Sequence, residues 1–115
     1  MAGTVEISEK TLDLVLEGMG AVVSEGGTAA RIFADYPIKI GGKSGTAQTG
    51  KEGKNDNGVF IAFAPFDDPE IAVCVVGECA GSGSNVAPIV RDILDGYFGA
   101  EDNSAKIAAE NTLLP

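Results

Sequence analysis

The fold of this chain depends on one segment, Ile38-Lys39-Ile40-Gly41-Gly42-Lys43-Ser44-Gly45-Thr46-Ala47-Gln48. Its apolar and polar residues alternate at first, which predicts a β-strand over residues 38–48. After two glycines, Lys43 and Ser44 supply a charged donor and a hydroxyl donor next to each other. Gly45 lets a second backbone approach the strand closely. We therefore predict that this segment binds an anionic, peptide-like group.

The charge distribution narrows the classes of partner. The net charge of −9 excludes nucleic acid and anionic membrane surfaces, because phosphate binding depends on lysines and arginines. Half of the eight basic residues nevertheless surround the central segment: Lys39, Lys43, Lys51 and Lys54. The chain has no histidine, the commonest general base and metal ligand. We expect neither a metal nor a cofactor.

Length and hydropathy indicate a single domain. The 115 residues suffice for one modest core. No apolar run approaches the ~20 residues of a membrane span. Residues 1–6 lack the basic start and apolar run of a signal peptide, so we expect no export signal in this chain.

A helix is predicted after Ser8, a favourable N-cap, and it should end at Gly26-Gly27. Apolar residues recur along it at helical spacing. We interpret this stripe as a face turned toward the core, formed by Leu12, Val15, Leu16, Met19 and Val22 or Val23.

Two further strands are predicted over Val59–Ala64 and Ile71–Val76, with a turn between them. Both runs are apolar throughout, so we expect both faces of this hairpin to be covered. Cys74 lies within the second run, where a buried free thiol is favoured over a disulfide with Cys79.

The closing helix is predicted to be capped by Ser84 or Asn85, to carry Pro88 in its first turn and to stop at Gly99. Residues 100–115 are expected to be disordered or loosely docked. The order helix, strand, strand, strand, helix predicts an α+β fold: an antiparallel sheet of about three strands flanked by helices.

A phosphate-binding loop is the first sharp alternative for the central motif. Gly42-Lys43-Ser44 matches the end of such a loop. That motif also needs a glycine where this chain has Pro37, and a helix that starts at the lysine. Since residues 45–50 are a poor helix start, the sequence argues against nucleotide binding. A glycine-rich bend in an unrelated sheet is the remaining alternative without a function.

Lys43-Ser44-Gly45 resembles the lysine-hydroxyl-glycine strand motif of the penicillin-binding proteins and serine β-lactamases. The longer segment 42–48 is similar to the form found in high-molecular-weight, class B-like transpeptidases, and Gly27-Thr28-Ala29 follows the first helix as in that family. The similarity runs over roughly residues 7–99. It implies that residues 1–99 are the C-terminal portion of a penicillin-binding transpeptidase domain.

The resemblance implies roles for four residues. Lys43 and Ser44 would bind the carboxylate of a terminal D-alanine or a β-lactam and assist proton movement. Gly45 would keep the strand open to the acyl chain. The Thr46 N–H would supply half of an oxyanion hole, so Lys43, Ser44 and Thr46 count as catalytic. The strand edge could pair with the substrate backbone.

Two motifs of the family are absent. No serine precedes a lysine by three positions, and no Ser-x-Asn occurs. The nucleophile is therefore expected outside this sequence, and the chain alone is expected to be inactive. The parent would cross-link peptidoglycan stem peptides by serine acyl transfer, anchored at the extracytoplasmic face of a bacterial membrane.

Two alternative functions, and one expectation about the sheet edge, stand beside the transpeptidase prediction. The chain could be a non-catalytic ligand-binding or interaction module, or part of a β-lactamase-related hydrolase. Residues 71–76 would form an unpaired apolar edge, because their partner strands in the family lie elsewhere in the domain. Pairing with a second copy of the chain, as a homodimer, follows as a hypothesis.

Overall fold

A computed structural model describes residues 3–99 of the chain. Its elements are α1 (Glu9–Val22), α2 (Ala30–Phe33), β1 (Gly41–Ala47), β2 (Asn57–Ala64), β3 (Ile71–Gly77), a 3₁₀ turn η1 (Gly83–Asn85) and a final helix over residues 87–99, called here the C-terminal helix. The tail expected at residues 100–115 lies outside the described residues. The predicted α+β order of elements is confirmed.

The three strands form an antiparallel meander in the order β1-β2-β3. In its register Ser44 lies opposite Phe60, which in turn lies opposite Val75. Among the described residues, β1 and β3 each pair with β2 alone, so both leave one edge of the sheet free. The motif strand is therefore an edge strand.

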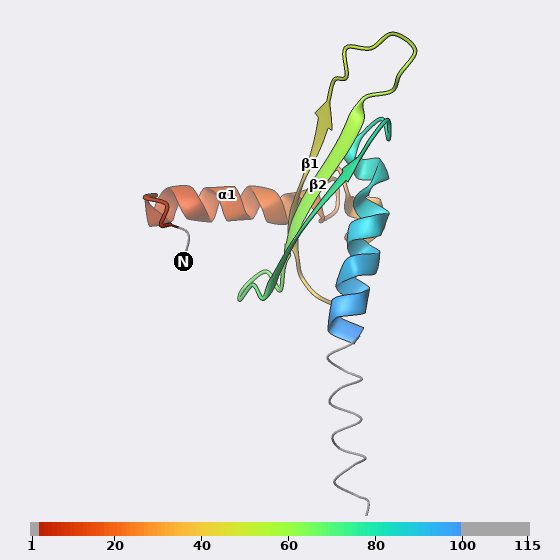
Figure 1. Cartoon of the computed structure of the whole chain (residues 1–115). Coiled ribbons are helices and arrows are strands. Elements are labelled where there is room, and N and C mark those ends of the chain that lie inside the picture. Colours follow the sequence, from red (N-terminus) through yellow and green to blue (C-terminus); the bar gives the residue numbers. More distant parts are fainter. Residues whose placement is uncertain (1–2, 100–115) are drawn as a thin grey trace, which may run out of the picture.

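One face of the sheet carries the core. Every second residue of β2 is buried, namely Gly58, Phe60, Ala62 and Ala64, as expected for a strand with one covered face. The C-terminal helix lies along this face (Figure 1) and contributes Ala87, Val90 and Leu94 to the same core, next to Val86, which directly precedes the helix. Phe33 of α2 closes it by stacking on Phe60, with ring centroids 5.9 Å apart.

Polar contacts fasten the C-terminal helix to the segment before β1. Arg91 donates to Asp35 Oδ1 (3.0 Å) and to the Ile32 carbonyl. The Arg91 guanidinium holds the pKa of Asp35 below its ordinary value. Burial, assisted by a hydrogen bond with Asp95, raises the pKa of Tyr36 to about 12. Residues 32–36 are thus held between the helix and the sheet.

Helix α1 is less buried than its sequence predicts. The N-cap is confirmed, since the Thr11 N–H donates to Ser8 Oγ (3.2 Å). The core-facing stripe is wrong at its start, where Leu12 and Val15 are exposed. It holds at its C-terminal end, where Val23 belongs to the core and Val22 packs against it. Within α1 itself, Gly20 is the one buried residue. The reason is visible in Figure 1, where α1 meets the sheet only with its C-terminal end and otherwise projects outward.

The second face of the sheet is open, which corrects the prediction that both hairpin faces are covered. Ile61 is 41% and Val76 is 61% exposed. Cys74 lies opposite Ile61 on this face, so its thiol is exposed and not buried as predicted. Both cysteines are free, in agreement with the sequence.

The start of the C-terminal helix also differs from the prediction. Ser82 caps the 3₁₀ turn by accepting from the Ser84 N–H (3.2 Å), and the helix begins only at residue 87. Pro88 falls in the first turn, as predicted. No helix within residues 3–99 is long and apolar enough to cross a membrane.

Candidate active-site wall on strand β1

The paired glycines at the start of β1 make room for two aromatic rings. A Cβ on Gly41 would lie 2.4 Å from the Phe63 ring, and one on Gly42 would lie 3.0 Å from the Phe60 ring. Successive side chains of a strand point to opposite faces, so the rings pass on opposite sides of β1. These glycines are explained by packing.

Packing within the structure does not explain the glycine at position 45. A Cβ at this position would meet only Val59 atoms at 3.9 Å, an ordinary contact distance. Its backbone does not need the left-handed region either, because its φ is not among the positive values. The space above Gly45 is therefore left open by the chain itself, which is what a site that receives another molecule requires.

Lys43 and Ser44 lie on opposite faces of β1, although they are adjacent in sequence. Lys43 is on the open face, across from Ile61, and Ser44 is on the covered face, across from Phe60. The Lys43 ammonium donates to the Ser44 carbonyl. The two donors thus flank the edge of the strand from both sides.

The structure adds Thr28 to the predicted residues. Its hydroxyl shares a hydrogen bond with the Ser44 hydroxyl, with 3.1 Å between the oxygens. The contact joins the turn before α2 to the middle of β1. The sequence already contained the signal in Gly27-Thr28-Ala29, but no pattern in it indicated that Thr28 reaches Ser44.

The backbone of Thr46 is directed toward the free edge. The Phe66 N–H donates to the Lys39 carbonyl (2.8 Å) where the chain enters β1. Backbone groups of an edge strand alternate between the partner strand and the free side. The Lys43 ammonium reaches the Ser44 carbonyl, which indicates that the backbone groups of Ser44, and of Thr46 two residues later, face the free side.

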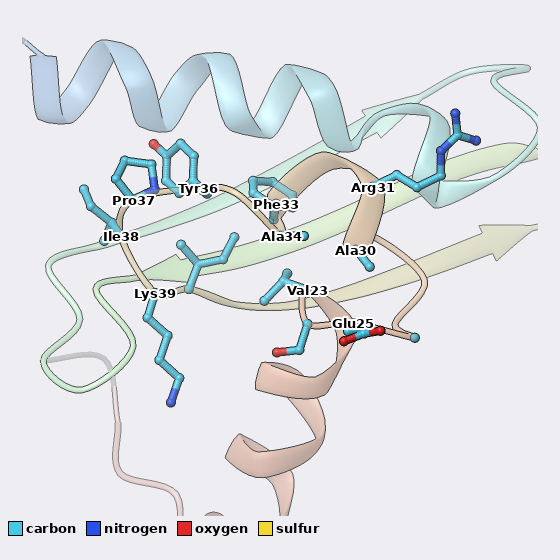
Figure 2. A pocket seen from close by; sticks show the side chains of 13 residues that line it. Val23, Glu25, Ala30, Arg31, Phe33, Ala34, Tyr36, Pro37, Ile38 and Lys39 are labelled. Atoms are coloured by element: carbon cyan, nitrogen blue, oxygen red, sulfur yellow. The ribbon is translucent and has the colours of Figure 1, made fainter.

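A pocket of 750 Å³ lies beside the segment that leads into β1, bounded by the end of α1, by α2 and by residues 36–40. Figure 2 shows the side chains that surround it, with Lys39 at one side and Arg31 at the other. The Lys39 ammonium makes a cation–π contact with Phe66, 4.2 Å from the centre of the ring. Within residues 3–99 no group of three or more His, Cys, Asp or Glu side chains could hold a metal ion.

The family model and the similar proteins all point to the same protein family. Residues 2–95 match the model of the penicillin binding protein transpeptidase domain. The chain is 35% identical over 113 residues to the peptidoglycan D,D-transpeptidase MrdA of Escherichia coli K12, covering 86% of this chain and 18% of that protein. It is 40% identical over 97 residues to stage V sporulation protein D of Bacillus subtilis, covering 76% and 15%. The chain thus spans less than a fifth of these relatives.

Solved structures agree with the fold. The Pseudomonas aeruginosa PBP2 structure in complex with WCK 5153 superimposes with a TM-score of 0.73 at 38% identity, covering 84% of this chain and 22% of that one. A peptidoglycan synthase complex that coordinates polymerization and crosslinking contains a chain with a TM-score of 0.70 at 35% identity, covering 84% and 17%.

Proposed function

This chain belongs to the penicillin-binding protein transpeptidase family, and we propose that it forms one wall of the active site of a peptidoglycan D,D-transpeptidase. The observation that carries the proposal is the position of residues 42–48 on a free sheet edge. Among residues 3–99, no neighbour comes close enough to the Cβ position of Gly45 to demand a glycine there. Relatives that carry the name D,D-transpeptidase support the reaction.

In the proposed reaction a serine outside this sequence attacks the carbonyl carbon of the D-alanyl-D-alanine bond of a stem peptide, and the terminal D-alanine leaves with the proton as its free amine. An amine of a second stem peptide then attacks the acyl-serine ester, which forms the new amide bond and releases the serine hydroxyl. The substrate backbone pairs with the free edge of β1. Lys43 and Ser44 bind the terminal carboxylate and assist proton transfer, as charged and hydroxyl donors can. The Thr46 N–H stabilises the developing oxyanion.

Mass spectrometry after incubation with a reactive penicillin tests whether the nucleophile lies outside this sequence and whether Lys43 assists it. The 115-residue chain should form no adduct, because it lacks Ser-x-x-Lys. The longer protein that contains it should form a stoichiometric adduct, and Lys43→Ala should slow its formation roughly 10²-fold or more. Lys54→Ala, which removes a nearby charge from the loop after β1, is the matched control. Equal rates for both variants would remove Lys43 from the mechanism.

Gly45→Ala separates binding from stability. The structure has room for the methyl group, so the unfolding free energy should change by no more than ~0.5 kcal/mol. Penicillin acylation of the longer protein should fall sharply, since the methyl group occupies the space proposed for the acyl chain. Unchanged acylation would contradict the proposed position of the substrate.

A hydrolase related to β-lactamases would use the same strand, so the products decide between the two reactions. We propose cross-linked stem peptides as the main product of the longer protein. Rapid drug turnover without cross-linking would indicate the hydrolase instead, and ligand binding without any acylation would indicate a non-catalytic module. The proposed location is the extracytoplasmic face of the bacterial membrane, with stem peptides and β-lactams as ligands.

The free edge of β3 is proposed to pair with a further strand, in this chain alone with a second copy. Residues 71–77 contain no charge, and charges are a common protection of free edges. Val76→Lys should therefore convert a sedimenting dimer into a monomer at micromolar concentration. A wild-type chain that is strictly monomeric would refute the homodimer without affecting the site on β1.

A further inference from the structure

The two arginines of the chain are used differently. Arg91 is paired with Asp35 and lies over the Tyr36 ring, 5.1 Å from its centre. Arg31 is exposed and has no hydrogen bond, ion pair or ring contact with any residue from 3 to 99. An unpaired guanidinium is notable in a chain with 17 acidic and 8 basic residues. Packing alone does not explain it.

Arg31 borders a second pocket on the far side of α2. Figure 2 shows its side chain directed away from the pocket that the other labelled residues surround. There it helps to line a hollow of 470 Å³ together with Thr28, Ile32, Ser84, Asn85 and Pro88. The lining contains one guanidinium, hydroxyl and amide groups and no acidic side chain, a set of hydrogen-bond donors suited to an anion.

This pocket is linked directly to the motif strand. Thr28 lines it and also hydrogen-bonds the Ser44 hydroxyl. Ser84 and Asn85 are held in place by contacts of their own: the Ser84 and Ser82 hydroxyls lie 2.7 Å apart, and Asn85 Nδ2 donates to the Ala80 carbonyl (2.6 Å). The walls are therefore fixed, while Arg31 at the rim is free to turn toward a ligand.

We propose that Arg31 and Thr28 form an anion subsite beside Ser44 that binds a carboxylate of the peptide held on β1. The inference rests on the proposed function for the identity of that peptide. The planar guanidinium can hold a carboxylate by two parallel hydrogen bonds, which a lysine cannot reproduce. Lys43 and Arg31 then approach the ligand from opposite faces of the strand, and the pair selects peptides with a free carboxylate over their amides.

Nuclear magnetic resonance titration of the 115-residue chain tests the subsite. The probes are acetyl-D-alanyl-D-alanine, its C-terminal amide, and acetate alone. The peptide acid and acetate should shift the Arg31 Nε–H and the Thr28 amide. Arg31→Gln should weaken binding of the peptide acid roughly 10- to 100-fold and leave binding of the amide unchanged. Arg31→Lys should recover only part of the loss.

Lys10→Gln, which removes one exposed charge from α1, is the matched control and should bind like the wild type. If the peptide shifts the β1 amides equally in wild type and Arg31→Gln, the subsite is refuted and the proposed function stands. If acetate shifts Arg31 but the peptide acid shifts neither Arg31 nor β1, the pocket binds small anions only and the subsite for the peptide carboxylate is refuted. Absence of both effects also refutes the subsite, whereas the proposed function fails only if the longer protein forms no penicillin adduct.

Discussion

Helix α1 and the C-terminal helix carry similar apolar stripes, but the sheet covers only one of them. Val90 and Leu94 of the C-terminal helix are fully buried, whereas Leu12, Leu14 and Val15 of α1 are exposed. The C-terminal helix runs along the sheet, and α1 touches it with one end (Figure 1). An apolar stripe therefore shows that a helix has a face to bury, and does not show that the partner is in the same chain.

The open face of the sheet is a second apolar surface that no described part of the chain covers. Ile61 and Val76 belong to strands as apolar as their neighbours, yet they are exposed beside the outward helix. The open sheet face is the side of β1 that carries Lys43, which lies opposite Ile61. In the proposed function this is the side from which the remaining part of the active site approaches, so the exposed apolar area and the missing nucleophile have one explanation.

The largest difference between the two helices should appear on shortening a leucine. Leu94 is 0% exposed and Leu14 is 60% exposed. Leu94→Ala should lower the unfolding free energy by about 2–5 kcal/mol, through lost burial and the cavity left behind. Leu14→Ala should change it by no more than ~0.5 kcal/mol. Urea unfolding measures both, and similar losses would show that α1 is covered in solution.

Adding a methyl group should give a smaller contrast of opposite sign. A Cβ on Gly83, just before the C-terminal helix, would lie 2.3 Å from the Val59 carbonyl oxygen, whereas one on Gly18 in α1 would meet nothing within 4 Å. Gly83→Ala should destabilise the fold by about 1–3 kcal/mol. Gly18→Ala should stabilise it by about 0.5–1 kcal/mol through helix propensity. Thermal unfolding of the two variants is the measurement.

Removing the cap of α1 should have a local effect. Ser8→Ala deletes the acceptor of the Thr11 N–H and should weaken the start of α1 by about 1 kcal/mol. Amide hydrogen exchange should become faster in the first turns of α1. Amides of the C-terminal helix serve as the internal control, and faster exchange there as well would mean that α1 is coupled to the core.

The last contrast, which appears only at alkaline pH, concerns the contact of Tyr36 with the C-terminal helix. Its pKa is raised from 10.0 to about 12, chiefly by burial and then by the hydrogen bond with Asp95. The folded chain holds this proton more tightly than the unfolded chain, so the stabilisation is complete below pH 10 and is lost as the pH rises toward 12. Tyr36→Phe should remove this part of the alkaline decline. Phenolate absorbance should confirm the late titration.

The features predicted correctly from the sequence are mainly those that depend on a few neighbouring residues. Ser8 caps its helix, Pro88 lies in a first turn, and the turn signals between residues 64 and 71 separate two strands, because each of these depends on a few neighbouring residues. The family indicated by residues 42–48 and the fold class predicted from the order of the elements are confirmed. The roles of Lys43, Ser44, Gly45 and Thr46 stay predictions.

The amino-acid sequence by itself determined the elements, their order, the charge around the motif and the membership of the family, since these follow from local propensity and from residue types at fixed spacing. Only the tertiary structure decided that Cys74 faces outward, that most of α1 is uncovered and that Thr28 meets Ser44. The physical reason is that burial depends on which surfaces pack together across the chain. A pattern of apolar residues indicates only that a surface favours burial. Which part of the protein covers it depends on the arrangement of the elements in space.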